Sequence, residues 1–124
     1  MKIVMIEENY IEFDSGTIIS MTHSQDCCEN VYADCSALRD YNILPSTGQA
    51  ITIGDIAFTD DIENCIEQVP DMGFNLISAD GSKWFVPCPN EQNGYYSDEL
   101  TMRIKRDGKT IMMDLTGCTE YTEC

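Results

Sequence analysis

Three turn signals divide the chain, and each lies between two apolar runs. They are Asp14-Ser15-Gly16, Asp80-Gly81 and Asp107-Gly108. Aspartate closely followed by glycine between apolar runs is typical of a β-hairpin, because glycine readily adopts the positive φ angles of tight turns. The sequence therefore predicts three antiparallel hairpins, which pair residues 10–13 with 17–21, 74–78 with 83–86, and 100–105 with 110–115.

Residues 26–38 have a different periodicity. Apolar side chains recur at Cys28, Val31, Tyr32, Cys35 and Leu38, which is the spacing of one face of an α-helix. Acidic residues in its first turn would suit the positive end of the helix dipole. We therefore predict an α+β fold in which antiparallel hairpins pack against one main helix. At this length we expect one domain over residues 1–124.

Two further segments need an assignment. The segment from Asp60 to Val69 fits both a helix and an alternating strand, and its strand neighbours favour a strand. Pro87 and Pro89 are expected to end the strand before them, because proline has no N–H to donate to a sheet. Residues 89–97, rich in Asn and Gly, are predicted to form a loop.

Negative charge is concentrated in the first two thirds of the chain. Residues 1–80 contain 15 acids against Lys2 and Arg39, whereas residues 81–124 contain 7 acids against 5 bases. The negative electrostatic field of such a surface repels nucleic acid and attracts basic protein surfaces. We therefore expect no direct binding of duplex DNA, and a partner that is itself a basic nucleic-acid-binding protein.

No segment of the sequence predicts export or membrane insertion. Lys2 is followed by four apolar residues and then by Glu7 and Glu8, which is too short for a secretory signal. No apolar run approaches the roughly 18 residues of a membrane span. We therefore expect a cytoplasmic protein of a host cell that does not bind membranes.

The seven cysteines raise the question of a metal or redox site. His23, Cys27, Cys28 and Cys35 are the candidate zinc ligands, with Cys88 as a further possibility. Zinc sites usually take ligands from C-x(2–4)-C pairs, and adjacent cysteines on a helix diverge by about 100°. We therefore expect buried thiols and no cofactor, and a zinc or redox module remains the alternative.

Catalytic signatures are missing from the sequence. His23 is the single histidine, so any Cys–His pair must use it. Cys27 lies near the start of the predicted helix, where the dipole favours a thiolate, but the charges of the nearby Asp26 and Glu29 disfavour one. The chain contains no P-loop, no G-x-G-x-x-G and no G-x-S-x-G motif. We therefore predict that this protein is not an enzyme and assign no catalytic residue.

Two smaller groups are candidate contact residues. Tyr95 and Tyr96 follow Asn93-Gly94 in the predicted loop, and exposed tyrosines are common at protein interfaces. Basic residues gather on the last hairpin, where they could contact RNA or phosphate, or balance nearby acids on a solvated strand face. These residues are Arg103, Lys105, Arg106 and Lys109.

Three stretches of the chain carry a family resemblance. The segment from His23 to Asp34, with the sequence HSQDCCENVYAD, resembles a family of small, acidic, largely uncharacterised proteins of phages and mobile elements. The stretches WFVPC (84–88) and NEQNGYYS (90–97) extend the similarity. The resemblance implies a phage or mobile-element origin. Small acidic proteins of that origin look like a recurrent type of anti-defence inhibitor, including anti-CRISPR proteins.

The sequence and this resemblance together suggest a stoichiometric inhibitor. A type II CRISPR effector nuclease holds its guide heteroduplex in a positively charged channel and reads DNA with arginines. An acidic domain can present carboxylates to the same arginines, blocking DNA binding, cleavage or guide loading. A phage structural or assembly protein, such as an edge-strand homodimer, is the remaining alternative. The candidate contact acids are Glu7, Glu8, Glu12, Asp14, Asp26, Glu29, Asp34, Asp60, Asp61, Glu63 and Glu67.

Overall fold

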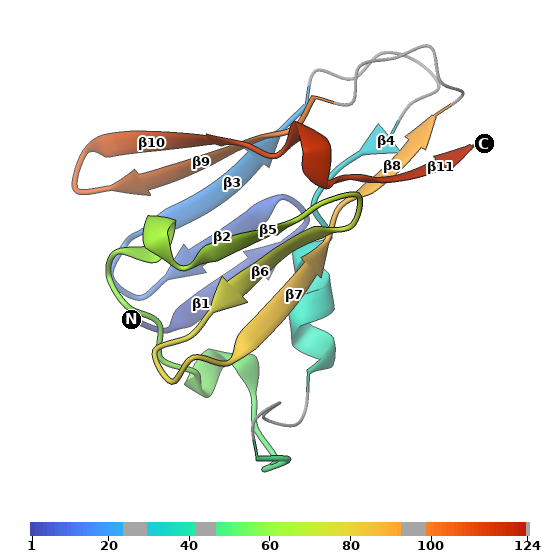
Figure 1. Ribbon diagram of the computed structural model, residues 1–124. Helices are drawn as coiled ribbons and strands as arrows, with labels where there is room; N and C mark the ends of the chain where they lie inside the picture. The colour runs from blue at the N-terminus through green and yellow to red at the C-terminus, as the bar shows by residue number, and fades with distance from the viewer. Residues whose placement is uncertain (24–29, 42–46, 93–98, 124) are drawn as a thin grey trace.

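In the described part of the chain the fold consists of three β-sheets (Figure 1). The computed structural model describes residues 1–23, 30–41, 47–92 and 99–123. The largest sheet has five strands in the order β1-β2-β3-β9-β10, and its neighbouring strands are antiparallel. Its strands are β1 (Ile3–Glu7), β2 (Tyr10–Phe13), β3 (Ile18–Thr22), β9 (Thr101–Arg106) and β10 (Lys109–Asp114).

The other two sheets have three strands each. One is antiparallel in the order β5-β6-β7, and the other has the order β11-β8-β4 with β11 parallel to β8. Their strands are β5 (Ile66–Val69), β6 (Gly73–Ile77), β7 (Lys83–Pro87), β4 (Asn30–Val31), β8 (Pro89–Gln92) and β11 (Glu120–Glu123).

All three predicted hairpins are confirmed. They are the pairs β2–β3, β6–β7 and β9–β10, with Tyr10 opposite Ser20, Asn75 opposite Phe85 and Ile111 opposite Ile104. The glycine of each turn has a positive φ angle, 89° at Gly16, 87° at Gly81 and 75° at Gly108. The glycines that predict the three turns therefore adopt the backbone conformation that such turns require.

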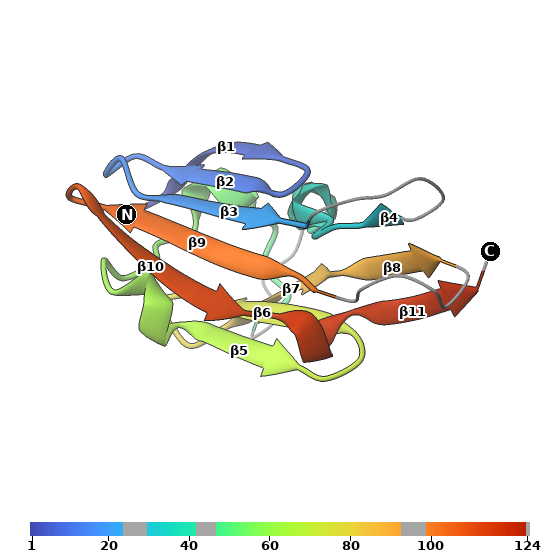
Figure 2. The ribbon, with the colours of Figure 1, turned by 90° about the horizontal axis from the view of Figure 1, so that it is seen from above.

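The hydrophobic core lies between the five-stranded sheet and the β5–β6–β7 sheet, which form two layers (Figure 2). Ile19 and Ile104 contribute from the first layer, and Leu76 and Trp84 from the second, all fully buried. The opposite face of the five-stranded sheet carries mainly polar and charged residues, together with Met5, Ile18 and Met112. That outward face and the ends of its strands therefore carry most of the charge discussed below.

The predicted main helix over residues 26–38 is wrong, and with it the α+β fold class. Residues 24–29 lie outside the described part of the chain, residues 30–31 form β4, and residues 35–40 form a single 3-10 segment, η1 (Cys35–Asp40). The helical segments of the described residues are all short 3-10 turns, the others being η2 (Ile53–Asp55), η3 (Ile62–Asn64) and η4 (Thr116–Cys118). The protein has a β fold.

The helix fails because distant residues bind its backbone. The N–H of Tyr32 donates to Pro89 O (3.2 Å), that of Ala33 to Asn9 Oδ1 (2.7 Å) and that of Asp34 to Pro87 O (2.8 Å). An α-helix would need those N–H groups for carbonyls four residues earlier. The helical spacing did identify buried side chains, since Val31, Cys35 and Leu38 are fully buried.

Two local predictions have mixed outcomes. The segment from Asp60 to Val69 contains the strand β5, as predicted, preceded by η3. Pro87 ends β7 as expected, but Pro89 begins β8, so residues 89–92 are a strand rather than a loop. Pro89 stands at the first position of a strand, where proline is tolerated, and its carbonyl accepts the bond from Tyr32.

Gly73 provides a test of the packing between β6 and β7. A Cβ atom at Gly73 would overlap the carbonyl oxygen of Val86 and lie 3.0 Å from the Cα of Pro87. Because both are backbone atoms, they cannot move without disturbing the strand pair. We expect Gly73→Ala to lower the free energy of unfolding by about 2 kcal/mol or more in urea denaturation.

The matched control is Gly117→Ala, since a Cβ atom there meets nothing within 4 Å. We expect the free energy of unfolding of that variant to lie within about 0.5 kcal/mol of that of the parent protein. Equal stability of the two variants would contradict the close approach of β6 to β7.

Candidate functional site: an acidic end of the molecule

The acids predicted as contacts do not form one continuous patch. Asp26 and Glu29 lie outside the described residues, and the other nine divide among three places. Glu8 and Asp34 lie at one end of the five-stranded sheet, and Glu7 and Glu12 lie on its outward face. The remaining five lie toward the opposite end or on the second layer, and these are Asp14, Asp60, Asp61, Glu63 and Glu67.

Asn9 assembles the first of these places. It occupies the turn between β1 and β2 with a positive φ of 59°, a conformation that asparagine tolerates. Its N–H donates to Ala33 O (3.0 Å), and its Oδ1 accepts from the Ala33 N–H (2.7 Å). This two-bond contact fixes the turn, with Glu8, against the segment that carries Tyr32 and Asp34.

Tyr32 lies close enough to three carboxylates for their charges to act on its hydroxyl. Partial burial raises the pKa of its hydroxyl, and the nearby carboxylates of Glu91, Asp34 and Glu8 raise it further. Glu91 is on β8, opposite Asn30 of β4. We call Glu8, Asp34 and Glu91, together with Tyr32, the acidic end.

The charges of the acidic end are not neutralised within the described residues. No ion pair found there involves Glu8, Asp34 or Glu91, and both glutamates are exposed. Asp34 is half-buried and accepts a hydrogen bond from Ser36 Oγ. Three carboxylates near one tyrosine form a surface suited to cationic side chains. Carboxylates bind such side chains by charge-assisted hydrogen bonds, and an aromatic ring binds them over its face.

Glu91 was missed from the sequence. It contributes to the acidic end because β8 pairs with β4, where Glu91 stands opposite Asn30, 61 positions earlier in the chain. The one signal in the sequence is its place in the stretch 90–97, within the segment that the sequence predicts to be a loop.

Glu7 and Glu12 accompany a second tyrosine on the outward face of the sheet. The hydroxyl of Tyr10 donates to Glu12 Oε1 (2.6 Å), and this bond is the main cause of its raised pKa. Glu7 stands opposite Tyr10 in the register of β1 and β2. These two acids therefore belong to a flat sheet surface rather than to the acidic end.

Two acids elsewhere in the fold, Glu63 and Glu67, are paired with cations. Arg106 forms two bonds to Glu63, of 2.6 and 2.7 Å, and also donates to the carbonyl of Asp60. Lys83 lies 3.0 Å from Glu67, which also accepts from Asn75. These contacts lower the pKa of both glutamates, chiefly through Arg106 at Glu63 and Asn75 at Glu67.

The predicted basic cluster is divided by the pleat of β9. Arg103 and Lys105 point outward and are exposed, and Lys109 is exposed at the hairpin turn. Arg106 has the opposite parity and is bound to Glu63. Tyr95 and Tyr96 lie outside the described residues.

The candidate zinc ligands lie only partly within the described residues. Among the described residues no three His, Cys, Asp or Glu side chains are placed to hold an ion. Nδ1 of His23 contacts the carbonyl of Glu99, and burial raises the pKa of Cys35 and of Cys88 to about 12. Cys27 and Cys28 lie outside the described part of the chain.

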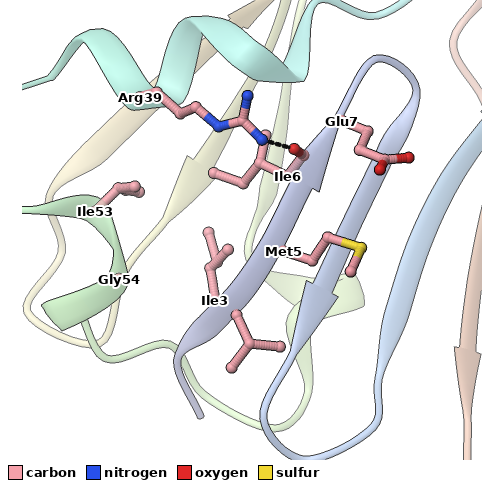
Figure 3. Close-up of a pocket in the computed structure, with 8 residues that line it drawn as sticks. Ile3, Met5, Ile6, Glu7, Arg39, Ile53 and Gly54 are labelled. Carbon is pink, nitrogen blue, oxygen red and sulfur yellow. Dashed lines mark hydrogen bonds between the residues drawn. The ribbon is translucent and has the colours of Figure 1, made fainter.

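A groove runs along the outer edge of β1 (Figure 3). It has a volume of about 320 Å³, and its walls include Ile3, Ile53 and Gly54. Arg39 of η1 reaches across it and donates to the carbonyl of Ile6, which occupies one acceptor of this sheet edge. Glu7 and Arg39 are the charged residues in its lining. The lining therefore offers no nucleophile with a neighbouring base.

The Glu63–Arg106 pair predicts a pH dependence of stability. The pKa of Glu63 is lowered in the fold, so its contribution is complete above the usual glutamate pKa of about 4.3 and is lost as the pH falls through the folded value. We expect Glu63→Gln to have a lower urea midpoint than the parent at pH 7, and the difference to shrink toward pH 3.

Glu120→Gln is the control, since Glu120 is an exposed acid of β11 outside this pair. We expect its urea midpoint to match the parent at both pH values. A Glu63→Gln deficit that does not change with pH would contradict the ion pair.

Cysteine reactivity tests the absence of a redox site in the described core. Iodoacetamide at pH 8 should leave Cys35 and Cys88 of the native protein unmodified, because both are buried and their raised pKa disfavours the thiolate. Cys65, which is half-buried, should react faster. Peptide mass spectrometry measures each site, with urea-unfolded protein as the control. Rapid modification of native Cys35 would show that it is accessible.

Comparison with protein families finds one match. The DUF7448 family, described as a domain of unknown function, matches residues 2–102, which is more than half of the chain. The chain therefore belongs to this family. The matched region ends within β9, so β10, η4 and β11 lie beyond it.

The other searches of the sequence and structure gave negative results. No curated protein matches the chain. No solved structure matches it either. Among the described residues no helix is long and apolar enough to cross a membrane.

Proposed function

We propose that this DUF7448 protein is a non-catalytic binding protein whose acidic end docks on a basic surface of a nucleic-acid-handling protein. The observation that carries the proposal is the acidic end itself. Its carboxylates gather around Tyr32 without a cation among the described residues, whereas Glu63 and Glu67 are each paired with one. A net charge of −15 would speed encounter with a cationic partner.

The proposed partner is a protein whose arginines and lysines normally contact phosphates. Such side chains meet one charge per about 1.7 Å of duplex axis, and a carboxylate can accept the same bidentate bonds from arginine. In the acidic end, Glu91 is on the strand β8, and the Asn9–Ala33 contact holds the backbone of Glu8 against the segment that carries Asp34. Their positions are thus set before binding, which reduces the entropy cost of docking.

A CRISPR effector nuclease is the specific partner that we propose to test first. The resemblance of residues 23–34, 84–88 and 90–97 to phage and mobile-element proteins supports this choice. The inhibitor would act either by occupying the DNA-binding channel of the guide-loaded effector or by blocking guide loading. In the second mode, the exposed residues Arg103, Lys105 and Lys109 could contact the guide RNA.

Charge reversal at the acidic end tests the proposal. We expect Glu8→Lys and Glu91→Lys each to weaken binding to the effector by roughly tenfold, about 1.4 kcal/mol, because an attraction becomes a repulsion. Binding is measured by surface plasmon resonance to empty and guide-loaded effector, at low salt and at about 0.15 M salt. Binding of the parent should weaken as salt rises.

Asp60→Lys is the matched control, since it makes the same charge change at an exposed site toward the opposite end of the sheet. It should reduce affinity far less than the other two reversals. Absence of binding by the parent protein at low salt to either form of the effector would refute the choice of partner.

The order of addition separates the two modes of inhibition. If the protein occupies the DNA channel, cleavage should be inhibited when it is added after the guide RNA. If it blocks loading, inhibition should require addition before the guide. A protein that fails to inhibit in both orders is not an inhibitor of that effector.

A further inference from the structure

The outward face of the five-stranded sheet has an ordered arrangement of charge. Its inner face packs on the β5–β6–β7 layer, and the outward side chains are half-buried or exposed. The register aligns them in two rows across all five strands. One row is Glu7, Tyr10, Ser20, Arg103 and Met112, and the other is Met5, Glu12, Ile18, Lys105 and Thr110.

The two rows place acids and bases on opposite sides of the sheet. The acids are on β1 and β2, the bases are on β9, and the central strand β3 contributes only uncharged residues to both rows. Glu12 and Lys105 both stand opposite Ile18, so about two strand spacings, or about 10 Å, separate their strands. Neither Arg103 nor Lys105 takes part in an ion pair within the described residues.

We infer that this face binds a second copy of the chain, with a two-fold axis parallel to β3. Rotation about this axis leaves each row at the same position along the strand direction and reverses the order of the strands across the sheet. Strand β2 therefore faces β9 of the partner. Glu12 then meets the partner's Lys105, and Tyr10 meets the partner's Arg103. Each contact occurs twice, as an isologous interface requires.

The uncharged residues fit the same arrangement. Ile18, on the axis, meets its own copy, and both edges of the face carry exposed methionines, Met5 at 46% and Met112 at 61% exposure. Flexible thioether side chains pack well against uneven surfaces. Face-to-face sheets normally keep their strand directions within about 30° and lie about 10 Å apart, which the two-fold axis permits.

The charge pattern favours a second copy over a different protein. A cationic partner would be repelled by Arg103 and Lys105, and an anionic one by Glu7 and Glu12, whereas this face is complementary to itself. The net charge of −15 on each chain opposes association. At about 0.15 M salt the Debye length is about 8 Å, so distant repulsion is screened more than the contact pairs are.

Sedimentation equilibrium of the full chain at about 0.15 M salt tests the inference. We expect a reversible dimer with twice the 14.0 kDa mass of one chain. Glu12→Lys and Lys105→Glu should each raise the dimer dissociation constant by about tenfold or more, because each reversal converts two symmetric attractions into repulsions.

Mixing the two variants gives the decisive result. In a heterodimer, Lys at position 12 of one chain faces Glu at position 105 of the other, and the second contact pairs the unchanged Lys105 and Glu12. An equimolar mixture should therefore regain dimer mass that neither variant forms alone. A face that bound an unrelated protein would not show this recovery.

Two matched control variants make the same charge changes at positions that do not lie on this face. Glu8→Lys lies in the β1–β2 turn, and Lys109→Glu lies at the start of β10 beside the hairpin turn. Both should dimerise as the parent does, and circular dichroism checks that all four variants fold. Glu8→Lys should weaken effector binding without affecting dimerisation, which separates this inference from the proposed function.

Three results would overturn the inference. A parent chain that sediments as a monomer up to about 1 mM would exclude a dimer. A dimer unaffected by the reversals at positions 12 and 105 would place the interface elsewhere. Failure of the mixture to recover dimer mass, with both variants folded, would exclude the two-fold axis along β3.

Discussion

The contact between Asn9 and Ala33 underlies much of this structure. Two hydrogen bonds join a turn at the end of the five-stranded sheet to the segment that leads from β4 to η1. The same bonds engage the backbone that a helix at residues 26–38 would have used. They also bring Glu8 beside the segment between β4 and η1 that contains Tyr32 and Asp34. A single asparagine in a left-handed conformation therefore connects the β fold to its acidic end.

The acidic charge of the chain serves different purposes in different parts of the fold. Glu63 and Glu67 bind cations of their own chain and so connect strands and turns. Glu7 and Glu12 lie on an ordered sheet face with Arg103 and Lys105 across from them. Glu8, Asp34 and Glu91 remain without a cation among the described residues. The net charge alone would have treated all of these carboxylates as equivalent.

Hairpins were predictable from the sequence because their signals are local. Asp-Gly turns at residues 80–81 and 107–108 set the backbone conformation within a few residues, and alternating side chains set the face. The helical spacing at Val31, Cys35 and Leu38 was a true burial signal that gave a wrong structure. Burial depends on side chains, whereas the conformation here was decided by hydrogen bonds to Asn9, Pro87 and Pro89.

By itself, the sequence determined the three hairpins, the absence of familiar catalytic motifs and the overall acidity, since each follows from residue types close together in the chain. Only the tertiary structure decided which acids are paired, that Glu91 joins Glu8 and Asp34, and that the bases of β9 are separated from the acids of β2 by β3. The physical reason is that ion pairs, sheet order and strand register depend on contacts between residues far apart in sequence. Local propensity carries no information about such contacts.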